Sequence, residues 1–341
     1  MPDETGTSEE QNEVSEGGQS IFGEKLAQRS QLVVMADAAL AIEGIRVAAQ
    51  VRLNHLAKRG AICPRTTELL RRSQELEDWA DDDLANLVLD HPAAHWFTRV
   101  NGTGGELIGK VLGYIEKFGR FYDLGDSMIP LDVKREPITI TITKGGKEEE
   151  KQVVWVAGIE RLTTPGKLHK YAGLVEGQRP EAGKKIGYNA DLRTMLFRLG
   201  TSMLKQKGKY FDFYIRYKAG LMARYERQGV KVMPTPMERT CIPCAKPVRL
   251  KSAKFCPDCG GKLTLKNEPE GVKWEGHVHM MCMRRMIKLF VDHLWQVWRE
   301  AEKLPVRQPY AVEYLGHSTI ITPWEMCDRE EARRSKKVRE A

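Results

Sequence analysis

Apolar residues recur three or four positions apart over most of the chain, which predicts a mainly α-helical fold. One such run covers residues 31–59 and ends at Gly60, a residue typical of a helix C-cap. A second, acidic run begins at Pro64 and stops before Pro92. The first stripe is Val33, Ala36, Leu40, Val47 and Val51, and the second is Leu69, Leu76, Trp79, Leu84, Leu87 and Val88. Together the two runs predict a long antiparallel helical hairpin, which would serve as a scaffold or as a dimerisation arm.

Further helical patterns follow the hairpin, and one segment alternates instead. Helices are predicted from about Ala190, from Gly208 to Arg227, where the stripe is aromatic, and from Val278 to Leu304, which we expect to pack on the helix after Asn189. Ile138–Thr143 and Gln152–Val156 alternate with β-branched residues, which predicts a small inserted β-hairpin. The hairpin suggests no function by itself.

The charge is distributed unevenly along the chain, and this distribution bears on which partners the protein binds. The net charge is +8, yet the first twenty residues hold six acids and no Lys or Arg, whereas residues 161–231 hold sixteen Lys or Arg against five acids. A basic middle favours an anionic partner such as nucleic acid. The chain has neither an apolar run long enough to span a membrane nor the apolar region of a signal peptide, so we expect a cytoplasmic protein with no membrane partner.

A glycine-rich turn offers the first candidate contact to nucleic acid. Asn101, Gly102, Thr103, Gly104 and Gly105 stand between a predicted helix at 93–100 and an apolar stripe that begins at Leu107. This order matches the helix-hairpin-helix pattern, in which a glycine turn presents backbone N–H groups to one DNA phosphate. Lys110 follows one turn later and would add a cation. The alternative is an ordinary packing joint between two helices.

A second candidate is the cationic loop that precedes the helix at Ala190. Lys184, Lys185 and Arg193 stand in or after a glycine-containing loop, and Asn189 directly precedes the helix. Lysine, arginine and backbone N–H groups at a helix start all suit a phosphate backbone. Charge alone equally allows a solvated basic loop.

The cysteines carry the most specific chemistry. Cys241 and Cys244 form one CxxC pair, and Cys256 and Cys259 form another. Two thiolate pairs on tight turns close a tetrahedral site, so we predict a structural zinc ribbon with these four metal ligands. A redox role is disfavoured because there are two pairs and no βαβ pattern. His277, His279 and Cys282 follow soon after, and we interpret them as ordinary residues at the start of a helix.

The order of these motifs carries a family resemblance. The glycine turn, KLHKYAGL at 167–174, Gly183 with Lys184, and Asn189-x-x-Leu192-Arg193 resemble the C-terminal domain of insertion-sequence transposases of the 110/116/902 group. The match covers about 91–227 and, with the ribbon as an insertion, continues through the 278–304 helix and LPVRQPYAVEYLGH. The resemblance implies a protein of mobile elements that acts in DNA transposition and recombination. It also implies partners: DNA, expected as duplex, a guide RNA in some members, and a second copy bound through the helical hairpin.

Two departures from that family limit what the resemblance implies for chemistry. Such transposases begin with an RNase H-like domain whose carboxylates hold metal, and here the acidic tail and helical arm occupy that place. The family's serine nucleophile lies in the loop after YAGL, but Glu176–Lys185 contains no Ser or Thr. Tyr188, Thr201 and Ser202 are weak substitutes, so the catalytic residues are unknown and enzymatic activity is undecided.

Three functions remain open at this stage. The chain is a DNA-binding part without its own nucleophile, or an active transposase with an unrecognised nucleophile or a separate RNase H-like nuclease, or a zinc-ribbon adaptor for proteins. The expected division is a disordered acidic tail (1–30), the hairpin (31–91), a helix-hairpin-helix domain (92–235), the ribbon (236–272), a closing helix and segment (273–327) and a polar tail (328–341).

Overall fold

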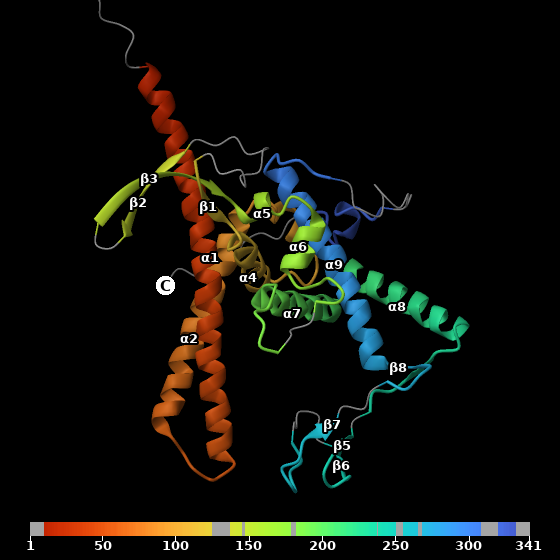
Figure 1. Ribbon diagram of the computed structural model, residues 1–341. Coiled ribbons are helices and arrows are strands. Elements are labelled where there is room, and N and C mark those ends of the chain that lie inside the picture. The colour runs from red at the N-terminus through yellow and green to blue at the C-terminus, as the bar shows by residue number, and fades with distance from the viewer. Residues whose placement is uncertain are drawn as a thin grey trace, which may run out of the picture.

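The fold is mainly α-helical, as expected, with small sheets attached to a helical body (Figure 1). The computed structural model describes residues 10–124, 137–144, 147–178, 182–236, 238–249, 255–264, 268–307 and 320–331. The first residues of the expected acidic tail, most of the polar tail and the greater part of LPVRQPYAVEYLGH lie outside these ranges. No helix in the described part of the chain combines the length and the apolar character needed to cross a membrane.

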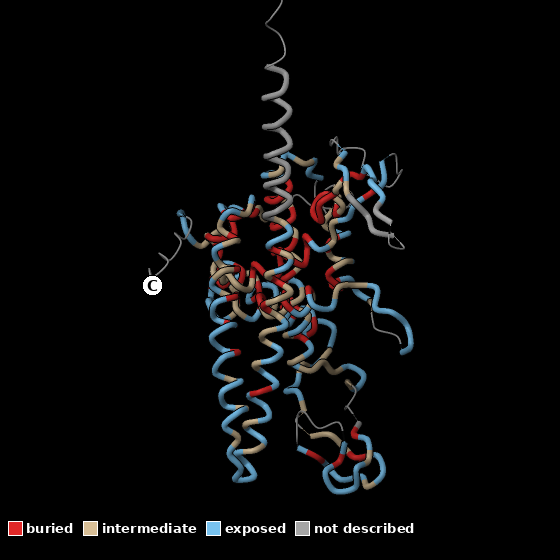
Figure 2. Tube along the Cα trace, turned by 90° about the vertical axis from the view of Figure 1, so that its left-hand side faces the viewer, coloured by how far each residue is buried: buried red, intermediate tan, exposed pale blue. Residues whose placement is uncertain are grey.

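The predicted helical hairpin is present as α1 (Glu10–Ala57) and α2 (Pro64–Leu87). Gly60 takes a positive φ of 72° in the connection. The expectation of a disordered tail through residue 30 was wrong from Glu10 onward, because α1 begins there. The segment from Glu10 to residue 30 has no proline and many good helix formers. Arg46 of α1 forms an ion pair with the mostly buried Glu77 of α2. The far end of the hairpin projects from the body and is largely exposed (Figure 2).

Short and long helices make up the body around α4. They are η1 (Val88–Asp90), α3 (Ala94–Phe97), α4 (Gly105–Glu116), α5 (Gly158–Arg161), α6 (Pro165–Tyr171), α7 (Ala190–Gln206), α8 (Lys209–Arg227), α9 (Glu275–Ala301) and η2 (Trp324–Met326). Helix α3 is shorter than the predicted 93–100 helix. Helix α4 lies against α1, α2 and α7, and it is buried from Ile108 to its end. It is therefore the central helix of the core.

Three glycines let α4 approach the helical hairpin closely. Gly105, Gly109 and Gly113 stand four residues apart and therefore share one side of the helix. A Cβ atom added at Gly105 would lie 2.6 Å from the Cβ of Ala85 in α2, and one at Gly113 would lie 2.5 Å from the Cβ of Ala36 in α1. Both distances are shorter than van der Waals contact, so these positions require glycine for packing.

Helix α9 closes the body, and it packs on α7 as expected. A Cβ added at Gly200 of α7 would lie 2.9 Å from the Ile287 side chain of α9. The buried Trp295 Nε1–H donates to the Leu162 carbonyl at 2.6 Å, and Arg299 donates to the Ile159 carbonyl at 2.8 Å. These bonds fix the chain around α5 to the last helix, because buried polar groups stabilise the fold only when paired.

The predicted β-hairpin is also present, and it gains a third strand. Strands β2 (Ile138–Lys144) and β3 (Lys147–Val156) pair antiparallel, with Ile138 opposite Val153. Strand β1 (Arg120–Asp123), which follows α4, pairs with the other end of β3, so the order is β1-β3-β2. The three-stranded sheet projects from the body beside α1 (Figure 1).

The cysteine segment is an insertion between α8 and α9. Strand β4 (Lys231–Met233) precedes it, strand β8 (Val272–Trp274) follows it, and the two pair in parallel. The chain therefore enters and leaves the insertion side by side. Inside it, β5 (Arg239–Cys241) lies between β6 (Pro247–Val248) and β7 (Leu263–Thr264).

Candidate metal centre and nucleic-acid surface

The four predicted metal ligands meet at one point. Cys241 is the last residue of β5 and Cys244 lies on the turn that follows, while Cys256 and Cys259 lie on a matching turn. In both turns the N–H of the residue after the second cysteine donates to the carbonyl of the first cysteine at 2.9 Å. Those residues, Ala245 and Gly260, have positive φ values of 54° and 69°. The two CxxC segments are thus copies of one local structure, which aims each pair of sulfurs inward.

The spacing of the sulfurs suits a tetrahedral metal ion. The Sγ atoms of Cys241 and Cys259 are 3.4 Å apart, those of Cys244 and Cys259 are 3.6 Å apart, and those of Cys244 and Cys256 are 3.8 Å apart. A metal–sulfur bond of about 2.3 Å in a tetrahedron places the sulfurs about 3.8 Å apart. All four ligand atoms lie within 4.8 Å of one another. A Cβ at Gly261 would lie 3.1 Å from the Cys241 sulfur, so glycine leaves room beside the site.

The thiols also need a cation in order to ionise together. Burial raises the pKa of Cys241 to about 12, whereas the backbone N–H of Lys246 lowers the pKa of Cys244 to about 7. A bound metal ion removes this difference because it stabilises every thiolate that it coordinates. The site is therefore compatible with a structural metal ion, held by a closed set of four protein ligands.

The three extra ligand candidates stand apart from the four cysteines, as predicted for ordinary helix-start residues. The Nδ1 atom of His277 lies 2.7 Å from the Glu268 carboxylate. The Nδ1 atom of His279 lies 2.8 Å from the Tyr214 hydroxyl, and Cys282 is buried in the main core. None of the three belongs to the cysteine cluster found among the described residues.

The polar groups of the glycine turn form hydrogen bonds with other parts of the protein. The Asn101 N–H donates to one oxygen of Asp328 at 2.6 Å, and the Lys209 N–H at the start of α8 donates to the other at 2.7 Å. The Thr103 hydroxyl is buried and donates to the Phe97 and Val100 carbonyls. Gly102, with a φ of 90°, packs on the backbone of Met203, where an added Cβ would lie only 2.5 Å from the Met203 Cα. The turn therefore joins α4, α7, α8 and the C-terminal segment as a packing joint.

Lys110 requires a correction, because it does not face solvent. Its side chain is 1% exposed, and its Nζ lies 2.9 Å from a carboxylate oxygen of Asp81 in α2. Burial and the neighbouring Asp81 raise the pKa of Glu106, which begins the same helix. Gly104, the N-cap of α4, has open space around it, but the first turn of α4 lies beside the carboxyl groups of Glu106 and Asp81. Lys110 is an internal counter-ion and is not available to a phosphate.

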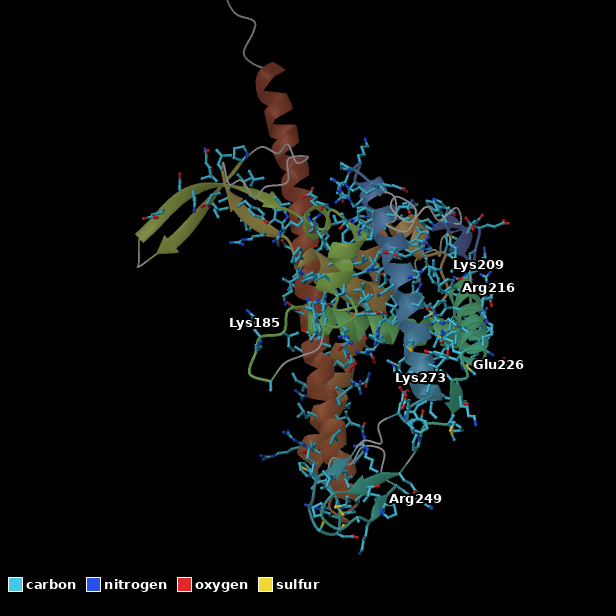
Figure 3. All side chains as sticks on the ribbon, turned by 45° about the vertical axis from the view of Figure 1, so that its right-hand side comes forward. Lys185, Lys209, Arg216, Glu226, Arg249 and Lys273 are labelled. Carbon is cyan, nitrogen blue, oxygen red and sulfur yellow. The ribbon has the colours of Figure 1, made fainter. Side chains whose placement is uncertain are left out.

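The cationic loop is open by comparison. Lys184 and Lys185 are exposed, and Gly183 has a φ of 78°. Asn189 caps α7 by accepting the Leu192 N–H at 2.9 Å, and its amide donates to the Tyr171 hydroxyl at 2.9 Å. The loop is therefore attached firmly at its α7 end. Figure 3 shows Lys185 on this loop, with Lys209 and Arg216 of α8 on the other side of α9.

Arg193 and Tyr188 form the base of this loop. The Arg193 guanidinium lies 5.2 Å from the centre of the Tyr188 ring. That ring covers Gly173, where an added Cβ would lie 2.5 Å from the Tyr188 Cδ2. The positive φ of Gly173, 64°, and the close ring both require glycine at this point of the YAGL segment. Arg193 is thus held on an aromatic surface and points to the same loop as the lysines.

A further set of cations lies on α9, which the sequence had indicated only as core. Arg284, Arg285 and Lys288 stand on the side of α9 away from its buried stripe, and Arg285 is exposed. His169 of α6 ties the two helices together, because its Nε2 lies 3.0 Å from Asp292 of α9. Lys170 follows His169 and is exposed. The one-sided spacing of 284, 285 and 288 was the signal that could have revealed this surface.

The substitute nucleophiles lack an activating partner. The Thr201 hydroxyl donates to the Phe197 carbonyl at 2.9 Å, inside its own helix. Within the described residues, Tyr188 and Ser202 form no hydrogen bond with a histidine or a carboxylate that could act as base. Nucleophilic attack needs such a base or a lowered pKa. The geometry therefore assigns no catalytic role to these three residues.

Comparisons with known protein families, with curated proteins and with solved structures find no match to this chain. Two features of the structure offer chemistry: a complete set of four metal-binding thiols, and a set of cations on α6, α7, α9 and the loop between α6 and α7. This set, here called the open cationic surface, consists of Lys170, Lys184, Lys185, Arg193, Arg284, Arg285 and Lys288.

Proposed function

We propose that the chain binds duplex DNA through the open cationic surface. The observation that carries this proposal is the lack of counter-ions: among the described residues, Lys185, Arg284, Arg285 and Lys288 form no ion pair. Cations without partners attract a phosphate backbone, and displaced counterions then drive binding. Arg193, stacked on Tyr188, adds a fixed guanidinium, and Asn189 holds the start of α7 in place.

The biological role proposed for this binding is in DNA transposition or recombination, in the cytoplasm, and it rests on the resemblance to the insertion-sequence transposases. The chain would act there as the DNA-binding part. Strand chemistry would come from a separate RNase H-like nuclease, because no activated nucleophile was found in the described part of the loop region. A guide RNA would be a second anionic ligand for the same surface.

A salt titration tests the proposed DNA binding. We expect the logarithm of the binding constant for a duplex to fall steeply with the logarithm of salt concentration, with a slope of about −3.6 to −5.4 for four to six phosphate contacts. Fluorescence anisotropy with a labelled duplex of mixed sequence gives this slope. A flat dependence, or no binding at low salt, would sink the proposal.

We propose zinc as the metal ion of the four-cysteine site. The support is the ligand set, because tetrahedral sites made of four thiolates favour zinc. Purified protein should contain about one zinc ion per chain, and a strong chelator should unfold the ribbon while the helical body keeps its circular dichroism. Iron as the metal found in purified protein, or an unchanged ribbon after complete metal removal, would refute zinc as a structural ion.

We also propose a homo-oligomer formed through the helical hairpin. Leu69 and Leu76 of α2 are 44% and 48% exposed and stand two turns apart. Trp79 of α2 and Ile45 of α1 are also exposed, and they lie close in sequence to Glu77 and Arg46, which pair the two helices. Exposed apolar stripes of this kind are typical of helix–helix interfaces. Light scattering should show that Leu76→Glu lowers the molecular mass to that of a monomer, and an unchanged mass would contradict the interface.

A further inference from the structure

The ribbon displays a row of three side chains on its outer surface. Cys241 of β5 pairs with Leu263 of β7, so Ile242 stands next to Lys262, to whose carbonyl the Ile242 N–H donates at 3.1 Å. Phe255 forms an isolated antiparallel bridge with the same Lys262. Directly opposed residues share one face of a sheet. Phe255, Lys262 and Ile242 therefore lie in one row across three neighbouring segments.

This row faces solvent, because its chain neighbours face the metal centre. Cys241, Cys256 and Leu263 are buried together in the ribbon core. Phe255 is 62% exposed and Ile242 is 61% exposed, so neither contributes to that core. A large aromatic and a large aliphatic side chain are thus exposed on either side of a lysine and are available to a ligand.

One cation of the row has no ion pair among the described residues. The described residues of the ribbon hold four Lys or Arg and two acids, and a zinc ion with four thiolates would add a charge of about −2, so the ribbon as a whole is close to neutral. The two acids already have partners: Asp258 lies 3.6 Å from Lys246, and Glu238 lies 2.9 Å from Arg249. Lys262 forms no ion pair within the described residues. The row is thus an apolar surface centred on an unneutralised cation.

We infer that this row binds a single-stranded nucleic acid, with an unpaired base stacked on Phe255 and the adjoining phosphate held by Lys262. Neighbouring segments of a sheet are about 4.8 Å apart, so the ring stands next to the lysine, whose long side chain can reach the phosphate that adjoins a base stacked on the ring. A duplex hides its base faces within the stack and cannot use the aromatic ring in this way. Ile242 extends the apolar surface under the next base.

This site is separate from the cationic surface of the helical body and does not depend on it. The helical surface offers cations around a loop and two helices, which suits a duplex backbone. The ribbon row offers one aromatic ring beside one cation, which suits a base that has left the helix. A chain with both sites would hold a duplex and a displaced or unpaired strand at the same time.

The test measures the binding of full-length, zinc-loaded protein to a labelled oligothymidine of about 20 nucleotides, which forms no base pairs. Phe255→Ala should weaken this binding by about 5- to 160-fold, the range expected for loss of one stacked base. Phe255→Trp should retain it, because tryptophan also stacks. Lys262→Ala should weaken it less and should reduce the salt slope by about 0.7. Zinc content confirms that each variant keeps its ribbon.

Matched controls distinguish this site from general binding. Phe121→Ala removes an aromatic residue of the other sheet, 40% exposed, and should change oligothymidine binding by less than about twofold. Duplex affinity should be unchanged in Phe255→Ala. The inference is overturned by unchanged oligothymidine binding in Phe255→Ala, by an equal loss for the duplex, or by a glutamate-rich peptide that competes as well as the oligothymidine. If the original chain binds oligothymidine but does not bind a duplex, the proposed function is contradicted and this inference is not affected.

Discussion

Two segments of this chain look alike in sequence and differ in the structure. The turn Asn101–Gly104, followed by Lys110, and the loop Gly183–Asn189 both combine glycine, a cation and the start of a helix. In the turn, the Asn101 N–H already binds Asp328, and Lys110 already binds Asp81. In the loop, Lys185 is exposed and forms no ion pair among the described residues. A phosphate site needs donors and cations that the protein itself has left unused.

The difference arises from contacts between distant parts of the chain. Asp328 reaches both the glycine turn and the first N–H of α8, so one carboxylate satisfies a turn N–H and a helix start. The loop before α7 is connected to the body through Tyr171 and Asn189, which bond to each other and leave the lysines outside. The turn contributes to stability, and the loop is available for function.

The largest expected effect is on stability, when the buried lysine of the turn helix is replaced. Lys110→Met should lower the free energy of unfolding by about 3–5 kcal/mol, because it leaves the Asp81 carboxylate without its buried partner. Denaturant unfolding measures this change. The matched variant Lys185→Met should change the same quantity by less than about 0.5 kcal/mol, since it is exposed.

The Lys110 variant also distinguishes the two roles that the sequence left open. We expect duplex affinity per folded molecule to be unchanged in Lys110→Met, because the ammonium group never reaches the surface. A variant that keeps its stability but loses DNA affinity would show that Lys110 contacts DNA, and the contrast between the two segments would be wrong.

A smaller effect is expected at the carboxylate that occupies the turn. Asp328→Asn should lower the free energy of unfolding by about 1–3 kcal/mol, because two charge-assisted hydrogen bonds are weakened and the new amide N–H₂ faces a backbone N–H. Thermal unfolding measures this change in stability, and duplex binding is measured on the same variant. A tenfold gain in duplex affinity would instead reveal the turn as a phosphate site that Asp328 masks.

Much of the fold could be predicted because it depends on local patterns. The hairpin of α1 and α2, the strands β2 and β3, and helices α7, α8 and α9 follow apolar periodicity. The four metal ligands followed from spacing, because each CxxC turn closes on itself. Strand β1 was missed, since it is short and becomes a strand only by pairing with β3.

The proposed DNA-binding surface was harder to predict, because availability of a side chain depends on distant partners. Nothing near Lys110 in the sequence indicates that Asp81 lies against it, and nothing near Asn101 indicates Asp328. The cations of α9 were overlooked because the apolar stripe on the same helix is strong. The sequence therefore indicates which residues are chemically suited to bind phosphate, and packing determines which of these residues remain exposed and unpaired.

The most direct test compares the salt dependence of duplex binding in two variants. In Lys185→Ala/Arg285→Ala/Lys288→Ala, three unpaired cations of the open surface are removed, and the log–log salt slope should become less steep by about 2.7. In Asn101→Ala/Lys110→Met, corrected for the folded fraction, the slope should equal that of the original chain. An unchanged slope in the first variant with a shallower slope in the second would contradict DNA binding through the open cationic surface.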